Sequence, residues 1–253
     1  MIQRVDHLVI LVNDLAQASA DYAALGFLVT PGGEHADGTT HNALVSFADG
    51  AYLELLAFQA EAPQHVWWRH VAAGQGLIDF ALLPGDTAED VEAARARGLE
   101  IAGPYAGGRS RPDGVRLEWQ TARPARPELP FLCGDVTPRE LRVPGPEAWG
   151  HANGARGLAQ VSVAVSNLDA SAGRYTALLG RRPLVELGRR LFRLGESYIA
   201  LRSPGPHEPE SGPIAAQLAA RGEGVFSFTL HSPSHAVGLC DLGLAHGARI
   251  TLD

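Results

Sequence analysis

A segment near the N-terminus is repeated later in the chain, and this repetition limits the folds that the chain can adopt. Residues 5–26 (VDHLVILVNDLAQASADYAALG) align with residues 158–180 (LAQVSVAVSNLDASAGRYTALLG) when one residue is inserted. In each copy, an apolar run typical of a buried strand leads to an Asp or Asn that can cap a helix, and the helical pattern ends at Gly. The chain is therefore predicted to repeat a unit that starts with a strand and a helix.

Further strands follow the helix of each unit. In the first unit they are predicted over 27–33, 40–50 and 51–58, and the dipeptide at 49–50, Asp-Gly, is a strong hairpin signal. The second and third units start at residues 76 and 158. A fourth, shortened unit starts at residue 224, and a helix is predicted in it around 234–246.

A unit of one strand, one helix and three strands cannot cover its own sheet face, so the units must pair to bury a core. We therefore expect a domain of two paired units at residues 1–135 and a linker at 136–156. Residues 157–253 are expected to form a degenerate second half, with one complete and one truncated unit.

The charge of the chain excludes several classes of partner. The sequence has 28 acidic and 21 basic residues, and all the basic ones are Arg, so the formal net charge is −7. General nucleic-acid binding needs a cluster of positive charge, which does not fit this composition. No stretch approaches the roughly 20 apolar residues of a membrane span. With two cysteines and no segment that resembles a signal peptide, we expect a cytoplasmic protein without a membrane partner.

A polar residue interrupts the first strand of every unit at the same position. These residues are His7, Asp79, Gln160 and Ser227. Glu54 lies in the middle of another apolar strand, in the first unit. An ionised carboxylate in such surroundings is costly unless it is paired or binds a metal. Ionisable groups at matching places in two paired units indicate a shared centre.

These residues carry a resemblance to a known family. The pieces DHLVILVNDLAQASADYAALGFLV, THNALVSF and YLELLAF closely resemble the glyoxalase-like branch of the vicinal oxygen chelate superfamily, and RSRPDGVRLEW, LPFLCG and residues 151–180 look similar to it. The resemblance implies an α+β fold in which tandem βαβββ modules pair into curled, mixed or antiparallel sheets with helices outside. In metal-dependent members, the first and last strands of paired modules hold a divalent cation that chelates adjacent substrate oxygens.

Carried over residue by residue, the resemblance places metal ligands at His7, Glu54 and Asp79. The fourth place falls near Cys133, which is more simply a small buried apolar residue. Asp79 has the alternative of pairing with a buried Arg. An oxygen-rich set of this kind suits Mn²⁺, Fe²⁺, Ni²⁺ or Mg²⁺ better than a thiol-rich Zn²⁺ site would. Glu54 is also the candidate general base.

Other polar residues are candidates for substrate binding. His41 and Asn42 start a predicted strand and are expected at the edge of the cleft. Arg109 or Arg111 could clamp a carboxylate or phosphate, although pairing with Asp113 or with solvent is the simpler interpretation. The segment at 64–70, QHVWWRH, either packs its Trp residues against the sheet or forms an aromatic lid.

Three functions remain open at this level. The first is a metal-dependent enzyme of isomerase or lyase type that acts on a small substrate with vicinal oxygens. The second is a metal-free protein that sequesters an apolar or aromatic ligand. The third is an assembly protein in which the degenerate half forms a homodimer interface. The partner in the first two cases is a small molecule.

Overall fold

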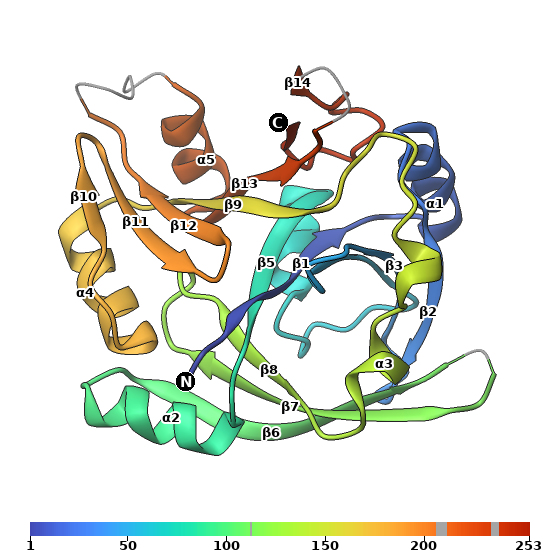
Figure 1. Ribbon diagram of the computed structural model, residues 1–253, viewed down its shortest axis with the longest axis horizontal. Coiled ribbons are helices and arrows are strands. Elements are labelled where there is room, and N and C mark those ends of the chain that lie inside the picture. Colours follow the sequence, from blue (N-terminus) through green and yellow to red (C-terminus); the bar gives the residue numbers. More distant parts are fainter. Residues whose placement is uncertain (112, 206–211, 234–237) are drawn as a thin grey trace.

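The structure, a computed structural model, describes residues 1–111, 113–205, 212–233 and 238–253, and its strands form two sheets (Figure 1). The first sheet is a closed barrel with the strand order β1-β4-β3-β2-β6-β7-β8-β5. The second is a seven-stranded sheet with the order β10-β11-β12-β9-β13-β15-β14. Together with the helices packed outside, they form the predicted α+β fold.

Two units of the predicted kind build the barrel. The elements of the first unit are β1 (Arg4–Leu11), α1 (Leu15–Ala24), β2 (Thr30–His35), β3 (Thr40–Ser46) and β4 (Tyr52–Phe58). Those of the second unit are β5 (Gly76–Leu83), α2 (Thr87–Ala96), β6 (Ile101–Ser110), β7 (Arg116–Pro124) and β8 (Phe131–Asp135). Within the first unit β1 pairs with β4 in parallel, and the units are joined where β1 pairs with β5 and β2 with β6, both antiparallel.

The helices begin where the sequence places their caps. The side chain of Asp14 accepts hydrogen bonds from the amides of Ala16 and Gln17 at the start of α1. Asn167 does the same for the amide of Ala170 at the start of α4 (Leu168–Leu179). These bonds satisfy amides that have no partner within the first turn of a helix.

The second sheet contains the third unit and the shortened fourth one. Its strands are β9 (Gly157–Ala164), β10 (Leu184–Glu186), β11 (Arg189–Leu194), β12 (Ser197–Arg202), β13 (Gly224–His231), β14 (Gly238–Leu239) and β15 (Ile250–Leu252). The helix predicted around 234–246 is wrong for residues 238–246, which form β14 and a series of turns, because Gly238 and Gly243 favour turns. Residues 234–237 lie outside the described residues.

A helix that the sequence analysis did not predict, α5 (Pro213–Arg221), precedes β13. Its signals were Pro213 in the first turn and the spacing of Ile214 and Leu218 on one face.

Two tyrosines at equivalent positions of the repeat connect elements that are far apart in the chain. Tyr22 of α1 donates a hydrogen bond to the carbonyl of Ala245, and Tyr175 of α4 donates one to the carbonyl of Glu128. Both side chains are fully buried, and one continuous apolar core includes residues of both sheets. A helix of each half is therefore hydrogen-bonded to a loop of the other half.

The segment predicted as a linker contains two short helices. It contains α3 (Arg139–Arg142) and the 3-10 helix η2 (Pro146–Ala148), and α3 lies against the barrel (Figure 1). A further 3-10 helix, η1 (Trp68–Ala73), connects β4 to β5. No helix among the described residues is long and apolar enough to cross a bilayer.

Candidate functional site

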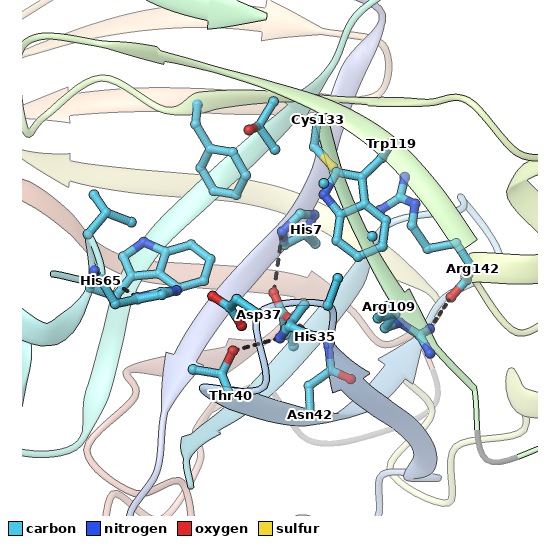
Figure 2. Close-up of a pocket in the computed structure, with 18 of the residues that line it drawn as sticks. His7, His35, Asp37, Thr40, Asn42, His65, Arg109, Trp119, Cys133 and Arg142 are labelled. Atoms are coloured by element: carbon cyan, nitrogen blue, oxygen red, sulfur yellow. Dashed lines mark hydrogen bonds and ion pairs between the residues drawn. The ribbon is translucent and has the colours of Figure 1, made fainter. Parts of the chain in front are cut away.

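A cavity of about 310 Å³ lies inside the barrel and is lined by side chains of both units (Figure 2). Its polar wall includes His7 of β1, His35 of β2 and Glu54 of β4. Its aromatic wall includes Trp119 of β7 and Phe131 of β8. The volume is at the lower end of the roughly 300–1,000 Å³ that ligand pockets span, so the cavity fits a small molecule.

Glu54 is the centre of the polar wall. Asn42 Nδ2 donates a hydrogen bond to Glu54 Oε1 at 2.5 Å, and His35 Nε2 lies 3.4 Å from the same oxygen. His7 Nε2 lies 3.5 Å from the other oxygen, Oε2. Burial by itself would raise the pKa of Glu54, but the hydrogen bond and charge of His35, the charge of His7 and the Asn42 bond lower it from 4.5 to about 2. Glu54 is therefore an ionised carboxylate inside the barrel.

His7 is oriented by its neighbour in the strand. Asp6 Oδ2 lies 2.8 Å from His7 Nδ1, and the imidazole stacks on the Tyr52 ring with 4.7 Å between centroids. Because the ionised Asp6 can only accept, Nδ1 carries a proton and Nε2 is the ring nitrogen presented to Glu54.

Asp6 is one of the two acids of a buried ion-pair network. Its oxygens lie 2.9 Å from Arg142 Nη1 and 2.7 Å from Arg139 Nη2, and both arginines also pair with Asp135. Burial by itself would raise the pKa of Asp6, but Arg142, the bond to His7 and Arg139 hold it well below its usual range. The network has two acids and two arginines, so its charges cancel.

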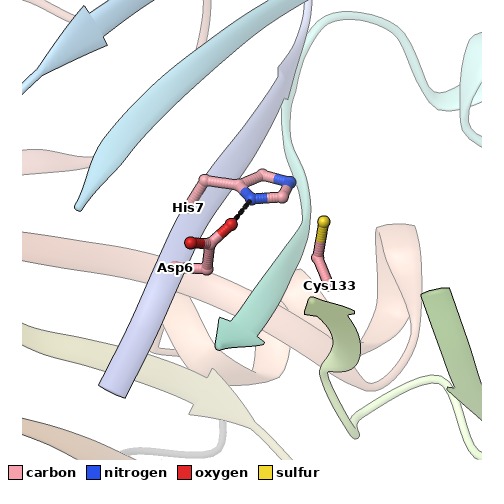
Figure 3. A group of neighbouring side chains, drawn as sticks. All are labelled: Asp6, His7 and Cys133. Carbon is pink, nitrogen blue, oxygen red and sulfur yellow. Dashed lines mark hydrogen bonds and ion pairs between the residues drawn. The ribbon is translucent and has the colours of Figure 1, made fainter. Parts of the chain in front are cut away.

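Three donor groups have the spacing of a metal site. Among the described residues, one ligand atom each of Asp6, His7 and Cys133 lie within 4.8 Å of one another (Figure 3). Asp6 is already held by two guanidinium groups, which would repel a cation placed between them. Burial also raises the pKa of the Cys133 thiol to about 12, so it is protonated. His7 Nε2 and Glu54 face the open cavity and are the better donors for a divalent cation.

The predicted third ligand, Asp79, does not join His7 and Glu54 at the cavity. Its Oδ2 accepts a hydrogen bond from Trp67 Nε1 at 2.7 Å and pairs with Arg123 Nη1 at 2.9 Å. Its Oδ1 accepts from the amide of Phe80. Asp79 therefore pairs with an arginine, as the sequence allowed as its alternative, although this arginine is partly exposed.

Of the four predicted substrate-binding residues, two line the cavity and two do not. Asn42 and Arg109 line the cavity. His41 does not, because successive side chains of a strand point to opposite faces and its neighbours Thr40 and Asn42 face inward. Arg111 lies outside the cavity and pairs with Asp113 at 2.7 Å.

Several residues at or directly behind the cavity wall were not singled out by sequence reasoning. Asp6 had a local signal, an acid next to a histidine within an apolar strand, whereas Tyr52 and Arg142 had none. The segment at 64–70 combines both of its interpretations. His65 and Trp67 line the cavity, and Trp68 packs edge-on against Phe58 with 4.9 Å between ring centroids.

The family of the chain follows from comparison with known sequences. The model of the glyoxalase-like domain matches residues 5–179, which is more than half of the chain. The chain belongs to the glyoxalase-like domain family. A search of curated proteins finds no significant match to this glyoxalase-like protein.

Solved structures show the same fold at low sequence identity. A hypothetical protein from Staphylococcus aureus is similar over 100% of this chain and 99% of its own, with a TM-score of 0.78 and 14% identity. A triple mutant of 4-hydroxymandelate synthase from Streptomyces coelicolor is similar over 91% of this chain and 71% of its own, with a TM-score of 0.67 and 20% identity. The glyoxalase-like protein thus shares its fold with these two structures.

Proposed function

We propose that this glyoxalase-like protein is a divalent-metal-dependent enzyme, of isomerase or lyase type, that acts on a small substrate with two adjacent oxygens. The observation that carries the proposal is the buried pair of His7 Nε2 and Glu54 Oε2, 3.5 Å apart at one cavity wall. The pair comes from β1 and β4, the first and last strands of one unit.

The donor types fit a metal ion. A neutral imidazole and a carboxylate are ligands for Mn²⁺, Fe²⁺, Ni²⁺, Mg²⁺ and Zn²⁺. Asp6 would act as the carboxylate behind a ligating histidine, which fixes the ring and raises the basicity of its free nitrogen. A bound cation would polarise substrate oxygens and stabilise negative charge that develops on them.

Residues of the chain would remove a proton from the substrate. Glu54 is in its acceptor form at neutral pH and can take a proton from substrate. Its low pKa means that it holds such a proton weakly and can return it to the substrate. His35 Nε2, 3.4 Å from Glu54 Oε1, stabilises the ionised form of the carboxylate. The other ring nitrogen, His35 Nδ1, lies 2.7 Å from Thr40 Oγ1, which orients the imidazole. The aromatic wall would keep water from the reacting atoms.

One observation favours the second function, metal-free sequestration of an apolar or aromatic ligand. Asn42, His35 and His7 together give Glu54 protein partners at both oxygens, so the polar wall is electrostatically balanced without a cation. Trp67, Trp119 and Phe131 would then supply the contact surface.

Metal content measured by inductively coupled plasma mass spectrometry separates the two functions. Chelator-treated protein is refilled with Mn²⁺, Fe²⁺, Ni²⁺ or Zn²⁺ and desalted. The enzyme proposal expects about one metal ion per wild-type chain, lost in His7→Ala and Glu54→Gln. His231→Ala, an exposed histidine of β13, is the matched control and keeps the ion.

The outcomes are distinct. Metal retained in Glu54→Gln would show that the assigned ligands are wrong. No metal in refilled wild-type protein would favour the sequestering protein. Asp79→Asn tests the remaining predicted ligand, and we expect it to keep the ion because Asp79 pairs with Arg123 instead.

A further inference from the structure

We propose that the cavity binds the oxyanion of a small organic acid, a carboxylate or phosphonate, through Arg109. This inference rests on the proposed function only in that it names the substrate class of the same cavity. Arg109 belongs to β6 and lines the cavity, and its side chain is deeply buried, with 4% of the residue exposed.

The guanidinium of Arg109 has neutral partners only. Its Nη1 donates a hydrogen bond to the carbonyl of Gly32, and its Nη2 donates one to the carbonyl of Arg142 at 3.0 Å. Within residues 1–111, 113–205, 212–233 and 238–253, no carboxylate forms an ion pair with it. A guanidinium has five N–H donors, so several remain for a ligand.

This arrangement differs from that of the other two arginines that line the cavity. Arg142 Nη1 lies 2.9 Å from Asp6 Oδ2, and Arg123 Nη1 lies 2.9 Å from Asp79 Oδ2. A buried charge without a directly paired counter-ion is costly, and burial lowers the pKa of Arg109 even though Tyr52 and Glu54 act in the opposite direction. An anionic ligand would supply the missing counter-ion.

One further polar atom of the wall, the Tyr52 hydroxyl, is available to the same ligand, and an unpartnered acceptor lies buried beside Gly32. The carbonyl oxygen of the Asn42 side chain is buried and has no hydrogen-bond partner among the described residues. A Cβ built on Gly32 would lie 1.9 Å from this oxygen, so the Asn42 side chain packs directly against Gly32. The carbonyl of Gly32 in turn accepts the hydrogen bond from Arg109 Nη1. Tyr52 Oη accepts a bond from Arg142 at 2.6 Å, and burial raises its pKa, so the phenol keeps a proton that it can donate.

These atoms define the ligand chemistry. Arg109 and the Tyr52 hydroxyl are donors, which suits the oxygens of an acid group. His7 and Glu54 lie on the same wall, so the oxygens next to the acid group would reach the proposed cation. The substrate class is therefore a small oxygenated organic acid rather than a neutral carbonyl compound.

Calorimetric titration of chelator-treated protein tests this assignment without the metal. The probes are benzoate, phenylphosphonate and the neutral isostere benzamide, at constant ionic strength. We expect at least one of the anions to bind about tenfold more tightly than benzamide, because a hydrogen bond to a charged group is worth at least that factor. The stronger of the two anions identifies the acid group.

The variants locate the anion. Arg109→Gln is expected to remove the preference for anions, whereas Arg116→Gln, an exposed arginine paired with Glu118, keeps it. If Arg109→Gln fails to fold, Tyr52→Phe provides the test, and it should weaken anion binding several-fold while benzamide is unaffected. Equal binding of benzoate, phenylphosphonate and benzamide to wild-type protein would overturn the inference, as would an anion preference that survives in Arg109→Gln or is undiminished in Tyr52→Phe. Because no metal is present, failure of the metal assay does not affect this result.

Discussion

Replacement of Asp6 by Asn should strongly destabilise the protein, although the change removes one charge and almost no volume. Asp6 is fully buried, and its carboxylate contacts Arg142 at 2.9 Å and Arg139 at 2.7 Å. Asn can still accept a hydrogen bond from His7, so the substitution isolates the loss of charge. It leaves Arg139 and Arg142 with Asp135 as their one remaining acid in the network.

The size of the expected loss in unfolding free energy follows from this burial. Two unit charges about 4 Å apart interact with roughly 4 kcal/mol at an effective dielectric constant near 20. Removing one partner of a buried ion pair typically costs about 3–5 kcal/mol, because the other charge stays buried without compensation. We expect a loss in this range for Asp6→Asn. The exposed pair Arg95–Glu92, 2.6 Å apart, is the control, and Glu92→Gln should cost less than about 0.5 kcal/mol.

Urea unfolding followed by circular dichroism measures these free energies, provided that the slope with urea is unchanged. The pH dependence has a defined sign. Because the pKa of Asp6 is lowered in the folded state, its contribution is present above the unfolded pKa near 4 and is lost at lower pH. The difference between wild type and Asp6→Asn should therefore be constant around neutral pH and shrink in acid.

A double-mutant cycle identifies the cause. Arg142→Met alone leaves one acid in excess, whereas Asp6→Asn with Arg142→Met leaves Asp135 and Arg139 as a balanced pair. The two losses should therefore fall short of additivity by about 2 kcal/mol or more. Additive losses, or a loss below about 1 kcal/mol for Asp6→Asn, would refute the claim that a buried charge network holds α3 on the barrel.

Three further changes test other parts of the structure. Burial, assisted by the charge of Arg69, lowers the pKa of His70 to about 4, so the folded state favours the neutral imidazole. The contribution of His70 to the free energy of unfolding is therefore present above about pH 6.5 and is lost as the pH falls toward 4. His70→Gln should flatten the fall of the melting temperature over that interval, and parallel melting profiles would contradict this account. Asp14→Ala removes the cap of α1 and should cost about 1 kcal/mol in urea unfolding, whereas an unchanged midpoint would mean that the cap is dispensable. Tyr175→Phe leaves the buried carbonyl of Glu128 without its 2.6 Å hydrogen bond and should cost about 1–3 kcal/mol by thermal unfolding; a neutral result would point to a replacement partner.

The repeated unit could be predicted from the sequence because its signals are local. Each signal acts within a few residues of where it stands. The signals are the apolar runs of the strands, the cap residues Asp14 and Asn167, and Gly180 at the end of its helix. The order of strands in each module then follows from the need to cover a sheet face. The shortened last unit was predicted less well because Gly-rich turns replace the expected helix at 238–246.

The site could be predicted in part. The resemblance implied that the first and last strands of a module carry the ligands. His7 and Glu54 meet because these strands, β1 and β4, pair in parallel. Asp79 occupies the equivalent place in the second unit, yet its carboxylate is taken by Arg123 and Trp67. Sequence position alone could not show whether a buried carboxylate faces the cavity or pairs with a neighbouring side chain.

The sequence by itself thus determined the modules, the helices of the first three units and the two residues at the centre of the candidate site. Only the tertiary structure decided how their charges are compensated, since Asp6 meets Arg142 across 136 residues and Arg109 meets no carboxylate in the described chain. The physical reason is a difference in range. Strand and helix patterns depend on residues close in sequence, whereas the state of a buried charge depends on whichever groups the fold brings within a few ångströms of it.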